Sequence, residues 1–162
     1  MIGERRAADL DLDEVETALL RAAVGDYAAE AAVLLLVNSG HWLPRLHAAG
    51  LIMIALDGDA VDGGPWAAVQ WPELDPALRT GAIAGTGGQL RLLRAAVSLA
   101  DGQPVDLADL TAGLDRAELT LLLAALAHAA GSHEHADVLP SGDGAPDARL
   151  PLGAVVPWPV RS

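Results

Sequence analysis

Residues 31–37, Ala31-Ala32-Val33-Leu34-Leu35-Leu36-Val37, decide the fold, because this stretch is apolar on every side of the helix that it predicts. Seven residues are far too few to cross a bilayer, which needs about 20. A helix that is apolar all round is buried on most sides, in a core or at a subunit contact. We therefore expect a helix over Tyr27–Val37, capped by Asp26, with the other helices packed around it.

The residues before and after this stretch predict further elements. A first helix begins at Asp11, which stands three residues before Glu14 in the spacing of a capping box. Pro44 predicts the first position of a short third helix. Two apolar runs separated by a cluster of turn-forming residues then predict a β-hairpin over about residues 51–71.

Three more helices are expected in the second half, after a glycine-rich stretch over residues 81–88 that we interpret as a flexible connector. The first covers Gln89–Asp101, and a short one covers Leu107–Leu114. The last runs from Asp115 to Ala130 and again starts with a capping-box spacing. Its predicted buried face consists of four leucines, Leu119, Leu122, Leu123 and Leu126.

The two ends of the chain differ from the middle. Residues 1–10 predict a flexible lead-in, residues 11–131 a single helical domain, and residues 132–162 a disordered acidic and Pro-rich tail. The apolar end of this tail, Ala154–Val160, either docks on a partner or lies on its own domain, and we favour the second. The expected fold class is α+β and mostly helical, with five to six helices, one β-hairpin and a disordered C-terminal tail.

Composition excludes several classes of function. The 162 residues contain ten arginines, no lysine and no cysteine, and the net charge is −12. Without cysteine there is no disulfide, thiolate nucleophile or cysteine zinc site, and without lysine there is no P-loop or Schiff base. The negative charge makes nucleic acid and anionic lipid unfavourable partners. With no apolar leader, a cytoplasmic protein without a membrane partner is expected.

Three histidines form the main candidate for chemistry. His128, His133 and His135 lie close together in the sequence, and imidazole nitrogens bind zinc, nickel or copper. The alternative is that they are polar residues exposed after a helix, so the sequence assigns no metal and no other cofactor. Asp57, Asp59 and Asp62 do not match the calcium loop of an EF-hand. No catalytic residue is identified, and the prediction is that the protein is not an enzyme.

Residues 89–130 place a long helix, a short helix at 107–112, the turn Gly113-Leu114-Asp115 and a second long helix in succession. This order resembles the amino-terminal winged helix-turn-helix module of IclR-type regulators, and the resemblance implies that the last helix reads DNA. A DNA reader needs several cations and hydrogen-bond donors. That helix supplies the single cation Arg116, and the residues after Gly131 are acidic and not strand-like. Helix pairs of this kind also make protein contacts.

The expected function is a non-catalytic protein-interaction or assembly protein that self-associates or binds another protein. A homo-oligomer is expected, and a small-molecule ligand is not identified. The alternatives are a winged-helix-like transcriptional regulator or accessory factor, and a metal-binding protein at the His128–His135 cluster. The candidate partner contacts are the exposed or unusually apolar positions Leu34, Leu36, Trp66, Trp71 and Trp158.

Overall fold

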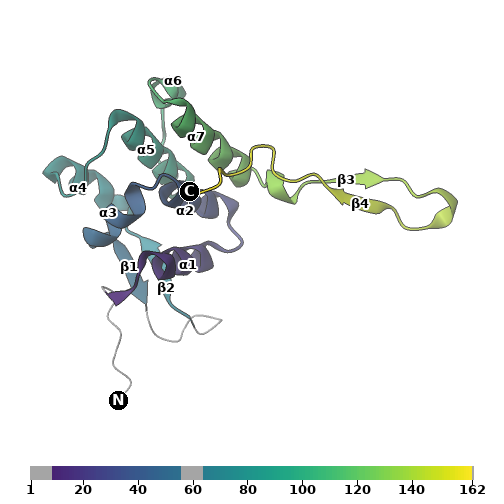
Figure 1. The fold of residues 1–162 in the computed structure, drawn as a ribbon, viewed down its shortest axis with the longest axis horizontal. Coiled ribbons are helices and arrows are strands. Elements are labelled where there is room, and N and C mark those ends of the chain that lie inside the picture. The colour runs from purple at the N-terminus through teal and green to yellow at the C-terminus, as the bar shows by residue number, and fades with distance from the viewer. Residues whose placement is uncertain (1–8, 56–63, 162) are drawn as a thin grey trace, which may run out of the picture.

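A computed structural model describes residues 9–55 and 64–161 of the chain, and it confirms a mostly helical α+β fold (Figure 1). The described residues form seven α-helices, two antiparallel strand pairs and three short 3-10 turns. The helices are α1 (Leu12–Ala23), α2 (Tyr27–Asn38), α3 (Trp42–Ala48), α4 (Leu74–Thr80), α5 (Gly87–Asp101), α6 (Leu107–Thr111) and α7 (Arg116–Ala129). The strands are β1 (Ile52–Ala55), β2 (Trp66–Val69), β3 (Ala136–Leu139) and β4 (Ala148–Pro151), and the 3-10 turns are η2 (Trp71–Glu73), η3 (Ser132–Glu134) and η4 (Gly142–Gly144).

Helix α2 lies at the centre of the molecule, as its apolar sequence predicts, and it packs against α1, α5 and α7. Asp26 caps it by accepting hydrogen bonds from two backbone amides of its first turn. Buried alanines on α2, α5 and α7 let these helices approach closely, because a methyl group takes little room between helix axes. Leu36, a predicted partner contact, is completely buried between them. It therefore cannot contribute to a binding surface.

Helix caps account for where several of the elements begin. Asp11 and Asp115 each form the predicted capping box, in which the cap and the residue three positions later hold each other's backbone amides. Thr86 and Gln89 form a third capping box that the sequence analysis did not identify. The helix that follows the glycine-rich stretch consequently starts at Gly87, two residues earlier than predicted.

The glycine-rich stretch is packed against the core rather than acting as a loose connector. The backbone carbonyl of Ala84 lies 2.9 Å from Nε2 of His41, and the Trp42 indole donates to the carbonyl of Gln89 at 2.8 Å. A Cβ placed on Gly85 would lie 3.0 Å from the Trp42 ring. The absence of a side chain at this position therefore lets the backbone pass over a buried tryptophan.

The predicted hairpin is present as β1 and β2, which pair from Ile52↔Val69 to Ala55↔Trp66. Ile52, Ala67 and Val69 are buried, and β2 packs against α1. The intervening loop, with Asp57, Asp59 and Asp62, lies outside the described residues.

Three helix predictions need correction. A seventh helix, α4, occupies the segment after the hairpin, where the sequence analysis identified no helix. Helix α3 begins at Trp42, so Pro44 lies inside its first turn, where the missing amide hydrogen breaks no helical bond. Helix α6 ends at Thr111 rather than Leu114.

The buried face of α7 is also different from the prediction. Of the four leucines expected to be buried, only Leu122 is, and Leu119, Leu123 and Leu126 are 39–46% exposed. Ala124 and Ala125 are buried instead. Leucines occur nearly all round this helix, so hydrophobicity alone does not choose a face. The side with alanines permits the closer approach to α2, and it is the side that packs.

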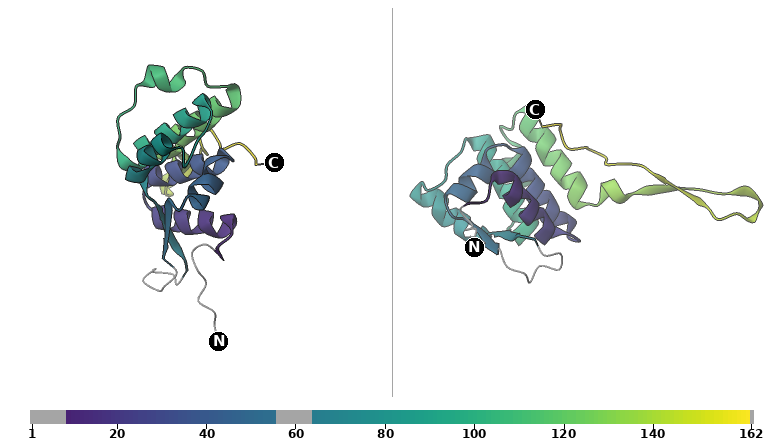
Figure 2. Two further views of the ribbon diagram at one scale, coloured as in Figure 1. Left: turned by 90° about the vertical axis from the view of Figure 1, so that its left-hand side faces the viewer. Right: turned by 60° about the horizontal axis from the view of Figure 1, so that its bottom comes forward.

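The region expected to be a disordered tail contains strands β3 and β4, paired from Ala136↔Pro151 to Leu139↔Ala148. We call residues 136–151 the arm. It projects from the body at the C-terminal end of α7 (Figures 1 and 2), and all eight strand positions are exposed. Asp143 and Gly144 have φ of 69° and 77°, a left-handed conformation that reverses the chain at the tip.

After the arm, residues 154–161 return to the body and form what we call the C-terminal strap. The amide of Val155 donates to Oγ of Ser132 at 3.3 Å, and Trp158 packs against the core. Both terminal nitrogens of Arg161 donate to the Glu16 carboxylate at 2.9 Å, and these bonds raise the pKa of Arg161. The apolar end of the chain thus lies on its own domain, the arrangement favoured from its sequence.

No helix in residues 9–55 and 64–161 combines the length and apolar character needed to cross a membrane.

Candidate metal centre

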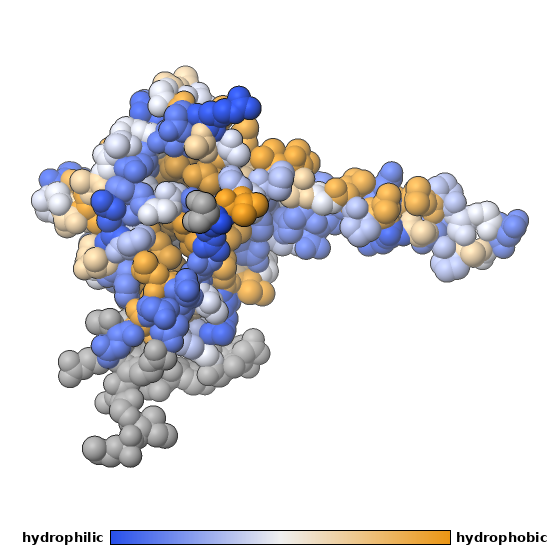
Figure 3. Space-filling view, in the orientation of Figure 1, coloured by the Kyte–Doolittle hydropathy of each residue, from blue (hydrophilic) through white to orange (hydrophobic). Residues whose placement is uncertain are grey.

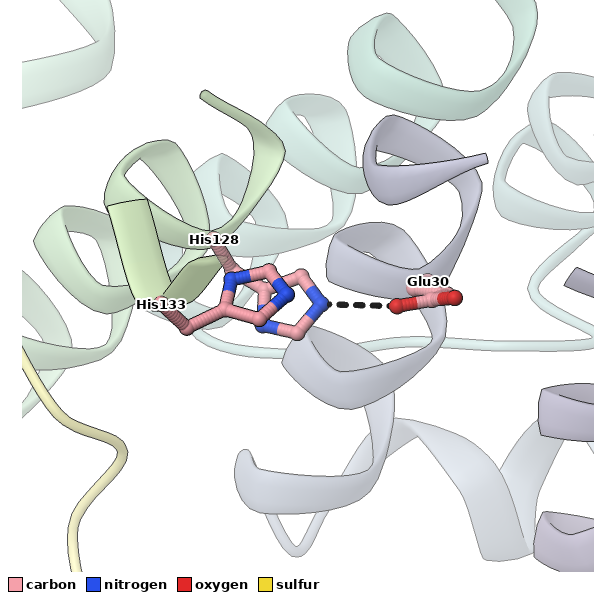
Figure 4. A group of neighbouring side chains, drawn as sticks. All are labelled: Glu30, His128 and His133. Atoms are coloured by element: carbon pink, nitrogen blue, oxygen red, sulfur yellow. Dashed lines mark hydrogen bonds and ion pairs between the residues drawn. The ribbon is translucent and has the colours of Figure 1, made fainter. Parts of the chain in front are cut away.

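Three potential metal ligands come together from three different elements. Glu30 lies on α2, His128 on α7 and His133 in η3, and one ligand atom of each lies within 4.8 Å of the other two (Figure 4). Glu30 and His128 are 98 residues apart in the sequence. The group therefore exists only because α2 and α7 pack side by side.

The helix N-terminus favours the negative charge of Glu30. Glu30 is in the first turn of α2 and His128 is in the last turn of α7. A carboxylate is stabilised near a helix N-terminus by about 0.3–1 kcal/mol at exposed positions. The packing of the two helices joins these ends, so that Nε2 of His128 lies 2.9 Å from Oε2 of Glu30.

Gly131 brings His133 back over His128. Its φ of 72° ends the helix in the left-handed region, and η3 then folds His133 onto the end of α7. The two imidazole rings are stacked, with centroids 4.1 Å apart and planes 16° from parallel. The edge of the Tyr27 ring packs against His133 with centroids 4.9 Å apart, which supports the stack from the α2 side.

The hydrogen bonds of His128 define its tautomer. The indole nitrogen of Trp158, a group that can only donate, lies 3.4 Å from Nδ1 of His128. Nδ1 is therefore the acceptor, and Nε2 carries the proton that is donated to Glu30. A histidine in this state is neutral and is bonded at both nitrogens.

His133 has an unused nitrogen. Its Nδ1 is buried and makes no hydrogen bond to any described residue, while its Nε2 is 3.9 Å from the carboxylate of Glu134. A buried polar atom without a partner costs about 1–3 kcal/mol. A ligand that bonds this imidazole would remove that cost.

The donor set suits a divalent transition metal. Two imidazole nitrogens and one carboxylate oxygen are the three protein ligands of many zinc sites that keep a fourth position open. The same set occurs in non-haem iron(II) sites. The side chains of His128, Glu30 and His133 are 15%, 20% and 24% exposed, so the group is sheltered but within reach of a dissolved ion.

The sequence analysis identified part of this group. His128 and His133 are brought together as the histidine cluster suggested, but His135 is exposed and does not join them. Glu30 was missed, since nothing in its local sequence points to a histidine so far along the chain. Its only signal is that it is an acidic residue at the edge of the most apolar helix.

The other predicted partner contacts differ in how exposed they are to solvent. Leu34 and Trp71 are half-buried, and Trp66 is 46% exposed at the end of β2. Trp158 is half-buried in the strap over His128.

Helices α5, α6 and α7 are followed by the β3–β4 pair, at a position where the sequence analysis expected no strand. Arg91 and Arg94 both form ion pairs with Asp109, and Leu119, Leu123 and Leu126 of α7 are exposed. The arm itself contains three aspartates and one arginine.

No family model, no curated protein and no solved structure matches this chain.

Proposed function

We propose that this protein binds a divalent transition metal ion, with zinc as the preferred ion, through Glu30, His128 and His133. The observation that supports this function is the convergence of two imidazoles and one carboxylate within 4.8 Å from three separate elements. Zinc accepts this donor set and has no geometric demand of its own beyond a tetrahedron.

Binding requires a rearrangement, in which the two stacked imidazole rings turn until the ion lies in the plane of both. Ligands on zinc bonds of about 2.1 Å lie roughly 3.4 Å apart in a tetrahedron. Glu30 and His128 are 2.9 Å apart, so they must separate slightly to admit the ion. The ion also takes the place of the proton on Nε2 of His128, and a proton is taken up at Nδ1 instead, so the ring stays neutral and its proton count does not change.

Metal binding should also break a hydrogen bond between His128 and the C-terminal strap. When Nε2 of His128 binds a metal, the neutral ring carries its proton on Nδ1. Nδ1 can then no longer accept the hydrogen bond from Trp158. Metal binding and the Trp158–His128 bond are therefore mutually exclusive, and the indole must turn away from the ring.

The direct test is calorimetric titration of the full-length, tag-free chain with zinc after treatment with a chelator. We expect one ion per chain, and we expect the substitutions Glu30→Gln and His128→Asn each to weaken binding at least tenfold. The matched control is His135→Asn, which removes an exposed histidine outside the group and should leave the affinity unchanged. Far-UV circular dichroism verifies that each variant is folded.

Tryptophan fluorescence provides an independent measurement. Zinc should change the emission of the wild-type chain, and most of that change should disappear in Trp158→Phe while calorimetry still shows one ion bound. The proposal is wrong if no zinc, cobalt or nickel binds at 100 μM, or if His135→Asn weakens binding as much as His128→Asn.

A further inference from the structure

The outer face of α7 presents a row of leucines that no described residue covers. Leu119, Leu123 and Leu126 are spaced by four and then three residues, so they lie on one side of the helix. Each is between 39% and 46% exposed. We call these three residues the α7 stripe. Arg116 lies one turn before Leu119 on the same side, and it forms no ion pair with the described part of the chain.

The arm presents a second row of leucines. Directly paired residues of an antiparallel ribbon share a face. The pairs Leu139↔Ala148 and Asp137↔Leu150 therefore place Leu139 and Leu150 on the same face. Leu152, two residues beyond Leu150, continues that face. We call Leu139, Leu150 and Leu152 the arm stripe, and each is 48–61% exposed. Hydrophobic residues are visible in Figure 3 on the part of the arm nearer the body, whereas its tip is mostly polar.

A surface that covers the arm is to be expected on physical grounds. An isolated two-stranded ribbon is at best marginally stable in water. Leucines on a projecting ribbon gain free energy when another apolar surface removes them from water. The arm points away from the body in Figure 1 and in the right view of Figure 2, so its own α7 does not provide that surface.

The α7 stripe of a second copy has the matching length and charge. Helix α7 has 14 residues and is about 21 Å long. Strand β3 has four residues and spans about 13 Å, and residues 140–143 extend the arm further to its tip. The arm carries Asp143 and Asp147 at its tip, whereas the α7 stripe has the cation Arg116 at its N-terminal end. An arm that starts near the C-terminal end of a partner's α7 therefore ends with its carboxylates at the arginine.

We propose that the chain forms a two-fold symmetric dimer in which the arm of each copy lies along α7 of the other copy. The arm stripe packs against the α7 stripe, and the acidic tip meets Arg116. Two-fold symmetry makes the contact reciprocal, so each copy contributes both an arm and a helix, and neither apolar row is left in water. This dimer does not depend on the proposed metal site.

Sedimentation velocity of the full chain, in the presence of EDTA, tests the dimer. At 50 μM we expect a species of twice the 16.6 kDa chain mass. Leu123→Asp on the helix and Leu150→Asp on the arm should each produce a monomer. Leu107→Asp is the matched control, since Leu107 is 67% exposed and belongs to neither stripe, and it should remain a dimer.

Mixing the two monomeric variants identifies which surfaces meet. A chain with Leu123→Asp keeps a normal arm, and a chain with Leu150→Asp keeps a normal helix. The mixture should therefore form a one-to-one heterodimer with one intact contact, although with lower affinity than the wild type. A monomeric wild-type chain would overturn the proposal. So would a Leu123→Asp variant that stays dimeric, the result expected if arms pair with arms, and so would a mixture that forms no heterodimer.

Discussion

Gly131 is the residue on which the stacking of the two histidines depends. It combines a φ of 72° with a close approach to Tyr27, since a Cβ at this position would lie 3.1 Å from the ring. The chain must turn here in the left-handed region, and it must do so against an aromatic side chain. Both requirements exclude a larger residue, and both place His133 over His128.

We predict that Gly131→Ala lowers the free energy of unfolding by about 2–3 kcal/mol. The left-handed backbone contributes about 1–2 kcal/mol of this, and the displaced Tyr27 ring contributes the rest. Gly102→Ala is the matched control, with a φ of 69° at the end of α5 and no atom within 4 Å of the added carbon. It should show the backbone cost alone in urea denaturation. Equal losses in the two variants would show that the Tyr27 contact contributes nothing.

Among the elements, α7 shows most clearly how packing chooses between faces of one helix. The position at which it begins is determined by nearby residues, because Asp115 and Glu118 form the capping box within a single turn. Its orientation is not local. Helix α2 packs against α7, and the side of α7 that carries Leu122, Ala124 and Ala125 is the buried one. The adjacent leucines are left outside, where they form the α7 stripe.

The corresponding prediction compares two neighbouring leucines of α7. Leu122→Ala should reduce the free energy of unfolding by about 2–5 kcal/mol, because it leaves a cavity in the core. Leu123→Ala should cost less than about 0.5 kcal/mol when dilute, monomeric protein is unfolded, because its side chain is 44% exposed. Chemical denaturation followed by circular dichroism measures both. A larger loss at Leu123 than at Leu122 would mean that α7 packs through its other face.

For the molecule as a whole, the dominant electrostatic fact is the net charge of −12. Carboxylates outnumber arginines by more than two to one, and several arginines are already used in ion pairs, such as Arg161 with Glu16. Arginine is charged at every pH near neutrality, and the bonds to Glu16 raise the pKa of Arg161 further, so this pair is not lost as the pH rises through that range. The remaining carboxylates repel one another more strongly in the compact state than in the unfolded chain.

Salt should consequently stabilise the protein. Raising sodium chloride from 10 mM to 150 mM shortens the Debye length from about 30 Å to about 8 Å. We expect the melting temperature to rise by about 2–4 °C, which corresponds to about 1 kcal/mol for a chain of this size. Differential scanning calorimetry at pH 7 measures the shift. A fall in the melting temperature would instead show that attractive ion pairs outweigh the repulsion.

The sequence by itself determined the elements that depend on neighbours within about four positions. These are the central apolar helix, the helix starts at Asp11 and Asp115, and the first hairpin, and together they establish the mostly helical α+β class. Capping bonds, turns and apolar periodicity act over one helical turn, so they can be read directly from the chain. The second strand pair was missed because its strands are exposed and lack the apolar alternation that marks a buried strand.

Only the tertiary structure decided which helix faces are buried and which distant side chains meet. Nothing near Glu30 indicates that it meets His128, and nothing in α7 alone leaves Leu123 outside while Leu122 is buried. The physical reason is that the burial of a face depends on the shape of the surface that receives it. That surface is built from residues far away in the sequence, and it exists only once the helices have packed.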